Sequence, residues 1–188
     1  MQPPLTTERL IVRDWTTSDS DVQAALAVYG RPEVTEWLTP VMTNVADLAA
    51  MRAVVHSWTE SQPNLVPPTG RWAMQRRSDD AVIGGLVLRM LPPYDHDLEL
   101  TWQLRPEAWG HGYATEAATA LLHWAFSCDI DEVFGLARPD NTRAIATAER
   151  IGMEWVGETT KYYDTALQVY RIRQGDLRDR PPAVETED

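Results

Sequence analysis

The chain has 188 residues, of which 44% are hydrophobic and 24% charged, so we expect one globular domain with a full core. The formal net charge of −11 argues against broad binding to nucleic acids or anionic membranes and favours amine or cationic partners. The lone cysteine, Cys128, excludes an intrachain disulfide, and the histidines include no pair at metal-ligand spacing, so we expect no metal site.

We expect no segment of this sequence to direct the chain to a membrane or to anchor it there. The first residues contain no signal-like apolar run, and the longest apolar stretch, Val82 to Leu88, includes glycines and is too short to span a bilayer. We therefore expect a cytoplasmic protein.

Hydrophobic periodicity predicts, in chain order, one strand, two helices, three strands, a helix, a strand, a helix and two strands. The predicted strands cover residues 10–15, 71–77, 81–91, 97–104, 133–137, 155–160 and 167–172. The apolar stripes of the predicted helices cover residues 22–29, 48–58, 114–125 and 144–151.

This element order predicts an α+β fold in a single domain, residues 1–173, built on a mixed sheet. Hairpins supply antiparallel neighbours, and the helix at 114–125 supplies a parallel crossover. Residues 174–188 hold Pro181-Pro182 and mixed charges with few apolar groups, so we expect an acidic, disordered tail.

A glycine-spaced turn, Trp109-Gly110-His111-Gly112, joins the alternating strand 97–104 to a helix. Glycines allow close approach of a ligand to backbone N–H groups, and a helix N-terminus favours phosphate. The turn lacks the third glycine of a dinucleotide-binding motif, because Thr115 occupies that place, and the chain has no Walker Gly-Lys-Ser/Thr. An ordinary loop before a helix is the alternative interpretation.

Several segments in order resemble the GNAT family of acyl-CoA-dependent N-acetyltransferases, in particular the branch that acetylates ribosomal-protein N-termini. The matching segments are Thr7–Arg13, Pro32–Val34, Trp37–Leu38, Trp109–Ala117 and Asn141–Met153. The resemblance covers most of the chain. It implies a single GNAT-like domain whose central sheet has about seven strands, with helices on both faces and a splay between the fourth and fifth strands.

The same resemblance implies acetyl-CoA as co-substrate. The backbone of the fourth strand would pair with the pantetheine arm like a neighbouring strand, the N–H groups from Gly110 to Thr115 would hold the pyrophosphate, and the Asn141 side chain would bond the pantetheine or diphosphate. The cofactor-binding residues implied are Trp102, Gln103, Leu104, Trp109, Gly110, His111, Gly112, Tyr113, Ala114, Thr115 and Asn141.

The chain departs from the family pattern at two positions. Glu107 stands where relatives often have Gln or Arg, so we expect it to point to solvent while Arg105, Arg143 or His111 meets the phosphate charge. Thr101 stands where the branch often has glycine.

Acetyl transfer needs a neutral amine to attack a thioester, and a general base is worth roughly 100-fold or more. Glu99 matches the glutamate that many relatives carry in the fourth strand and shares a strand face with Thr101 and Gln103. The equally weighted alternative is that Glu99 is only a solvated or salt-bridged strand residue.

The departing thiolate lacks its usual proton donor. Relatives carry a tyrosine or a serine where this chain has Ala148 and Ala144. We therefore predict that water or a late tyrosine protonates the thiolate, with Tyr163 preferred over Tyr162. The alternative is that either tyrosine lines the acceptor pocket or packs on the sheet.

These observations favour transfer of acetyl from acetyl-CoA to a primary amine, on a protein N-terminus or a small molecule, by a monomer or homodimer. Three alternatives stay open: transfer of another acyl group, a non-catalytic acyl-CoA sensor, and an enzyme that binds nucleotide phosphates. The sequence does not name the acceptor, and we expect its specificity to lie around Trp37, in residues 65–70 and around Tyr162 and Tyr163.

Overall fold

The computed structural model describes residues 5–38, 40–92 and 97–177. The long strands and helices follow one another in the order that the hydrophobic pattern predicts. The strands are β1 (Leu5–Thr6), β2 (Leu10–Asp14), β3 (Gly70–Arg76), β4 (Val82–Met90), β5 (Leu98–Leu104), β6 (Glu132–Ala137), β7 (Glu154–Thr159) and β8 (Leu167–Arg173). The α-helices are α1 (Asp19–Tyr29), α2 (Pro32–Thr35), α3 (Leu48–Ser61), α4 (Tyr113–Phe126) and α5 (Thr142–Ile151).

All the described strands join one sheet in the order β1-β2-β3-β4-β5-β6-β8-β7. Neighbours are antiparallel except β5 and β6, which are parallel because α4 carries the chain across the sheet between them. The sheet is mixed, as the sequence predicts, and the domain is α+β.

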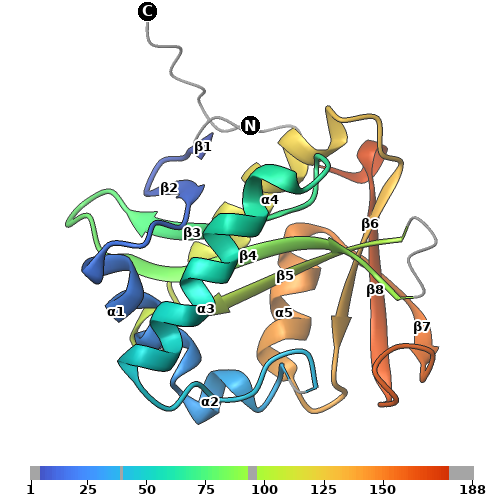
Figure 1. Ribbon diagram of the computed structural model, residues 1–188. Helices are drawn as coiled ribbons and strands as arrows, with labels where there is room; N and C mark the ends of the chain where they lie inside the picture. The colour runs from blue at the N-terminus through green and yellow to red at the C-terminus, as the bar shows by residue number, and fades with distance from the viewer. Residues whose placement is uncertain (1–4, 39, 93–96, 178–188) are drawn as a thin grey trace, which may run out of the picture.

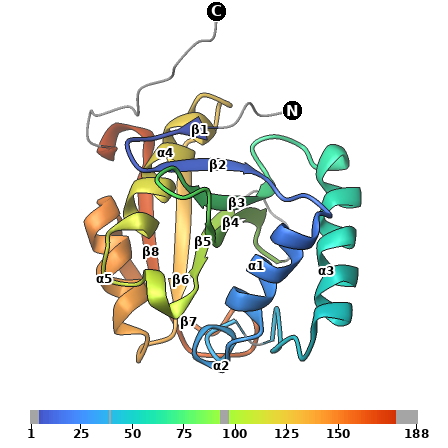
Figure 2. The same cartoon turned by 90° about the vertical axis from the view of Figure 1, so that its left-hand side faces the viewer.

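Helices cover both faces of the sheet. Figure 2 shows α1 and α3 on one side of it and α4 and α5 on the other. The face toward α4 packs residues such as Leu100 and Leu121, and the opposite face packs residues such as Ala73 and Val22. Alanines at helical spacing let α4 approach the sheet closely, since Ala117 and Ala125 are fully buried.

The sheet opens between β5 and β6. Their parallel ladder contains a single pair, Glu99 with Phe134, whereas β5 pairs with β4 along its whole length. Figure 1 shows the two strands diverging from this point. The edge of Thr101–Leu104 that faces β6 is therefore left without a strand partner, and the predicted splay between the fourth and fifth strands of the sequence pattern is confirmed.

The structure adds short elements to the prediction. The strand β1 raises the strand number to eight, and α2 is a single turn that begins at Pro32. Neither is long enough to produce a hydrophobic period. The first residues of the predicted tail, Gln174–Asp176, form a 3₁₀ turn, and residues 178–188 of the tail lie outside the described residues. Within the described ranges, no helix has both the length and the apolar character needed to cross a membrane.

Candidate active site

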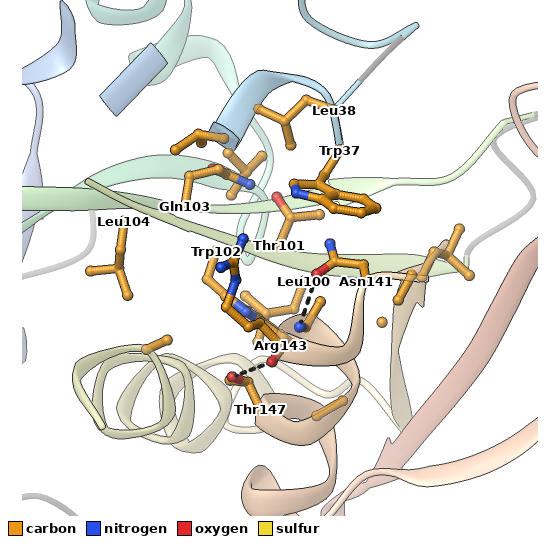
Figure 3. Close-up of a pocket in the computed structure, with 18 of the residues that line it drawn as sticks. Trp37, Leu38, Leu100, Thr101, Trp102, Gln103, Leu104, Asn141, Arg143 and Thr147 are labelled. Atoms are coloured by element: carbon orange, nitrogen blue, oxygen red, sulfur yellow. Dashed lines mark hydrogen bonds between the residues drawn. The ribbon is translucent and has the colours of Figure 1, made fainter. Parts of the chain in front are cut away.

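One groove, with a volume of about 1320 Å³, follows the opening between β5 and β6. Figure 3 shows Trp37 and Leu38 on one side of β5 and Asn141, Arg143 and Thr147 of α5 on the other. The groove also reaches the loop before α4 and the turn between β7 and β8, so residues far apart in sequence share one space. All the predicted cofactor-binding residues line it, as do Glu99 and Tyr163.

The glycine loop has the backbone shape that an anion site needs. Gly110 and Gly112 have φ angles of +79° and +78°, which side-chain-bearing residues rarely adopt. Gly112 is the N-cap of α4 and makes no side-chain capping bond, so the first N–H groups of the helix remain available to a ligand. A Cβ on Gly110 would meet nothing within 4 Å, so the loop encloses open space. These features fit a pyrophosphate group.

A bridge from the N-terminal strands holds this loop in place. Glu116 in the first turn of α4 accepts hydrogen bonds from Thr7 Oγ1 at 2.5 Å and from the Nε of Arg9 at 2.7 Å. Arg9 also donates to the carbonyl oxygen of His111 at 2.8 Å, and its guanidinium lies 4.8 Å from the centre of the Tyr113 ring. The motif at Thr7–Arg13 therefore contacts the phosphate loop directly.

Arg143 and His111 line the groove near the loop, and Arg143 supplies a positive charge there. The guanidinium of Arg143 stacks on Trp109 at 3.8 Å from the ring centre, and the Trp109 indole donates to the carbonyl oxygen of Leu104 at 2.9 Å. Arg105 lies instead close enough to Asp79, in the β3–β4 turn, to interact electrostatically with it.

Glu107 turns away from the phosphate loop, as expected. Its side chain is 63% exposed, and its Oε1 lies 3.3 Å from Arg31. The carboxylate of Glu107 therefore points to solvent and its charge is partly balanced by Arg31.

Asn141 is both a helix cap and a groove residue. Its Oδ1 accepts a hydrogen bond from the backbone N–H of Ala144 at 3.1 Å, which caps the N-terminus of α5. Because the cap uses the side-chain oxygen, the amide NH₂ is the group that Asn141 can offer to a ligand.

The β5 segment Trp102, Gln103 and Leu104 presents its backbone to the groove. The Trp102 side chain is partly buried against the core, as its place in the alternation predicts. Gln103 is buried on the opposite face, where its Oε1 accepts a hydrogen bond from the Tyr29 hydroxyl at 3.1 Å. The packing of both side chains fixes the strand edge that the resemblance assigns to the pantetheine arm.

Glu99 is buried, with 3% of its surface exposed, and its carboxylate is paired. Arg89 on β4 is opposite it in the register and donates from Nε and Nη2 to Oε2 at 2.8 and 2.7 Å. The hydroxyl of Tyr163 donates to the same oxygen at 3.3 Å. Glu99 is therefore salt-bridged, as one of the two interpretations of this residue expected. The structure also brings Glu99 and Tyr163, the two residues proposed for catalysis, into contact.

The two late tyrosines have different surroundings. Tyr162 is buried with Leu91 and Leu167 and donates to Asp97 at 3.2 Å, and burial together with the charge of Asp97 raises the pKa of its hydroxyl. Tyr163 has a φ angle of +58° and turns its ring toward Arg89 at 5.6 Å. Of the pair, Tyr163 is the one that reaches Glu99.

Sequence reasoning missed Arg71, Arg89 and the contacts of Arg9. The pairing of Arg89 with Glu99 depends on the register of β4 and β5, and that of Arg9 with Glu116 depends on a contact between residues 107 positions apart. The hydrophobic periodicity of one segment gives neither the register between two strands nor a contact between distant residues. Among the described residues no group of histidine, cysteine or acidic side chains could hold a metal ion.

The comparisons with known proteins agree with this geometry. The family model of the acetyltransferase (GNAT) domain matches residues 9–154. The uncharacterized N-acetyltransferase YoaA of Bacillus subtilis is 25% identical over 181 residues, which cover 92% of this chain and 97% of YoaA.

Solved structures share the fold. A GNAT-family acetyltransferase from Bacillus anthracis superposes with a TM-score of 0.75 at 20% identity, covering 92% of this chain and 99% of its own. The ribosomal-protein-S5-alanine acetyltransferase from Vibrio fischeri superposes with a TM-score of 0.71 at 15% identity, covering 94% and 100%.

The chain belongs to the GNAT acetyltransferase family, since the family model spans well over half of it. It is therefore an acyl-CoA-dependent N-acyltransferase, and acetyl-CoA is the co-substrate of its family.

Proposed function

We propose that this enzyme transfers an acetyl group from acetyl-CoA directly to a primary amine of a small molecule or a protein N-terminus. The observation that carries the proposal is the single groove that joins the phosphate loop at Gly110–Gly112 to the Glu99–Tyr163 pair. A cofactor bound by the loop would run along β5 and place its thioester near Glu99.

Each part of acetyl-CoA has a suitable partner in the groove. The pyrophosphate fits the N–H groups at the start of α4 and the charge of Arg143, and the pantetheine arm fits the open edge of β5 from Trp102 to Leu104. The amide of Asn141 is a donor for the same arm. The cofactor supplies the activated acetyl group, and the protein residues orient it.

The reaction then proceeds by direct attack. The amine nitrogen bonds to the thioester carbon, the carbon–sulfur bond breaks, and the nitrogen loses a proton. Glu99 accepts that proton, directly or through water, on Oε1, because Arg89 and Tyr163 donate to Oε2. Tyr163 gives its hydroxyl proton to the CoA thiolate and recovers one from Glu99, so the proton lost by the amine ends on sulfur.

We also propose that the enzyme works in the cytoplasm, as a monomer or homodimer, without nucleic-acid or membrane partners. The formal net charge of −11 supports the absence of nucleic-acid and anionic-membrane partners, because such polyanions would be repelled.

The test is incubation with acetyl-CoA and a panel of primary amines, with release of CoA thiol followed by a thiol reagent and products identified by mass. We expect thiol release that depends on the amine and an acetylated product. Tight acetyl-CoA binding with no thiol release for any amine, including protein N-termini, would instead identify a sensor. If the enzyme turns over a longer acyl-CoA faster than acetyl-CoA, the longer acyl group would replace acetyl as the group transferred.

A further inference from the structure

Arg71 has an unusual position in the acceptor half of the groove. It is the second residue of β3, it faces Val87 on β4, and Val87 faces Thr101 on β5. Arg71, Val87 and Thr101 all line the groove. Among the described residues, the Arg71 guanidinium has no hydrogen-bond or ion-pair partner, and the Arg71 backbone N–H donates to the Oε1 of Gln62 at 2.9 Å.

The neighbouring charges do not compensate this guanidinium. The charge of Arg89 is matched by Glu99. The carboxylate of Glu33 is 53% exposed and lies 4.0 Å from Arg31. Burial lowers the pKa of Arg71, and the positive charge of Arg89 acts in the same direction. A partly buried cation without a counter-charge is costly, so an anion bound there would be favourable.

A second donor in the groove points to a ligand with oxygen acceptors. The indole N–H of Trp37 is buried and has no hydrogen-bond partner in the described part of the chain. Figure 3 shows Trp37 above β5, on the side of Thr101. This part of the groove therefore offers donors that the protein itself does not satisfy.

We propose that the acceptor carries a carboxylate close to its reactive amine and that Arg71 binds this carboxylate. The inference rests on the proposed function and specifies its acceptor. Arg71 and Glu99 are two strands and two residues apart, about 12 Å between Cα atoms for regular sheet spacing. Their side chains stand on the same face of the sheet and line the same groove, and a separation of this size suits a small amino acid or one N-terminal residue.

Two sources present this chemistry. A free amino acid offers its α-carboxylate, and a protein or peptide offers the side chain of an N-terminal aspartate or glutamate. A polyamine places a second cation next to Arg71 and is disfavoured.

The experiment compares pairs of acceptors in which an amide replaces the carboxylate. Each rate is expressed per concentration of neutral amine, because the amide also lowers the pKa of the neighbouring amine. One pair is alanine and alanine amide, and the other is a peptide that begins with aspartate and the same peptide beginning with asparagine. For the wild-type enzyme we expect kcat/KM to be at least about 10-fold higher for the carboxylate member of one pair, which also identifies the source.

Arg71→Gln should remove this preference by lowering kcat/KM for the carboxylate member alone, with acetyl-CoA affinity unchanged and a melting temperature no lower than that of the wild type. Arg71→Lys should keep part of it, because the charge remains while the bidentate fork is lost. Arg52→Gln, which removes an exposed charge on α3, is the matched control and should leave the preference intact.

The proposal is overturned if wild-type enzyme acetylates both members of each pair equally, or if Arg71→Gln retains the preference. If Arg71→Gln does not fold, the proposal is still tested by the preference of the wild-type enzyme within each pair and by the reduced preference expected for Arg71→Lys. Failure of the proposed function looks different, because then no amine of any kind would be acetylated.

Discussion

Glu99 receives its hydrogen bonds from Arg89 and Tyr163 on one carboxylate oxygen, which leaves Oε1 for the reaction. Glu99→Gln keeps the shape and removes the base. We expect turnover to fall roughly 100-fold at neutral pH with the Michaelis constant for acetyl-CoA unchanged, because the nucleophilic amine must then lose its proton unaided. Steady-state kinetics from pH 6 to 10 measures this.

Raising the pH should restore much of the lost rate, since the free amine fraction increases. The loss of the Arg89 ion pair requires a control, so the melting temperature of Glu99→Gln is compared with that of the wild type. A stable variant with wild-type turnover at neutral pH would remove Glu99 from the mechanism.

Tyr163 and Tyr162 form a natural pair of test and control. Tyr163→Phe deletes the hydroxyl that contacts Glu99, so we expect lower turnover at unchanged acetyl-CoA affinity. Tyr162→Phe deletes a hydroxyl that contacts Asp97, and we expect a change in stability with turnover retained. A defect of Tyr163→Phe confined to the Michaelis constant for the amine would make Tyr163 a wall of the acceptor site.

At the residue level the sequence predicted which side chains line the candidate site better than it predicted the contacts between those side chains. Glu99, Tyr163 and Asn141 were nominated through the resemblance to the GNAT family, and all line the groove. Arg89 and Arg71 became visible only when the register of β3, β4 and β5 was known, because each is an ordinary charged residue within its own strand.

The loop before α4 depends on two residues with positive φ angles. In the double variant Gly110→Ala and Gly112→Ala, each alanine adds about 1–2 kcal/mol of strain when the backbone keeps its left-handed conformation. We expect the free loop to relax and acetyl-CoA affinity to fall at least about 10-fold, measured by calorimetric titration.

Gly152→Ala is the matched control for this loop. Gly152 also has a positive φ angle, +99°, but it caps the C-terminal end of α5. The Gly152→Ala variant should lose stability without losing acetyl-CoA affinity. Equal losses of affinity in both variants would mean that general destabilisation, not the loop, is responsible.

Arg9 connects the N-terminal strands to the same loop. Arg9→Ala removes the side-chain hydrogen bonds to Glu116 and His111, so we expect weaker acetyl-CoA binding and faster amide exchange over residues 110–116. Arg9→Lys keeps the charge but cannot form both bonds, and it should resemble the alanine variant. Restoration of binding by lysine would show that charge alone matters.

At the element level the order and type of the long elements were predictable because each buries one periodic face. The helix at 114–125 was expected from its apolar stripe, and α4 buries Ala114, Ala117, Leu121 and Ala125. The β1 strand and the α2 turn were not predicted, since their stability comes from pairing with β2 and packing near α1 instead of from local pattern.

At the scale of the whole molecule, the groove lies where the sheet divides. The β1–β5 part with α1 and α3 meets the β6–β8 part through one backbone pair between β5 and β6, and α4 and α5 pack beside the opening. A ligand held by β5, the glycine loop and α5 contacts both parts. Its binding energy therefore adds to the stability of the folded state.

Thermal unfolding tests this whole-molecule effect. Acetyl-CoA at 100 times its Kd should add about 2.7 kcal/mol, which corresponds to a rise of roughly 5–11 °C in Tm for a chain of this size. ATP, which shares the adenosine and phosphates, and pantethine, which shares the arm, each contact part of the groove and should raise Tm much less at the same concentration. A rise with ATP equal to that with acetyl-CoA would favour a nucleotide-binding enzyme. That result would contradict the assignment of β5 to the pantetheine arm, because ATP has no group that could follow the open strand edge.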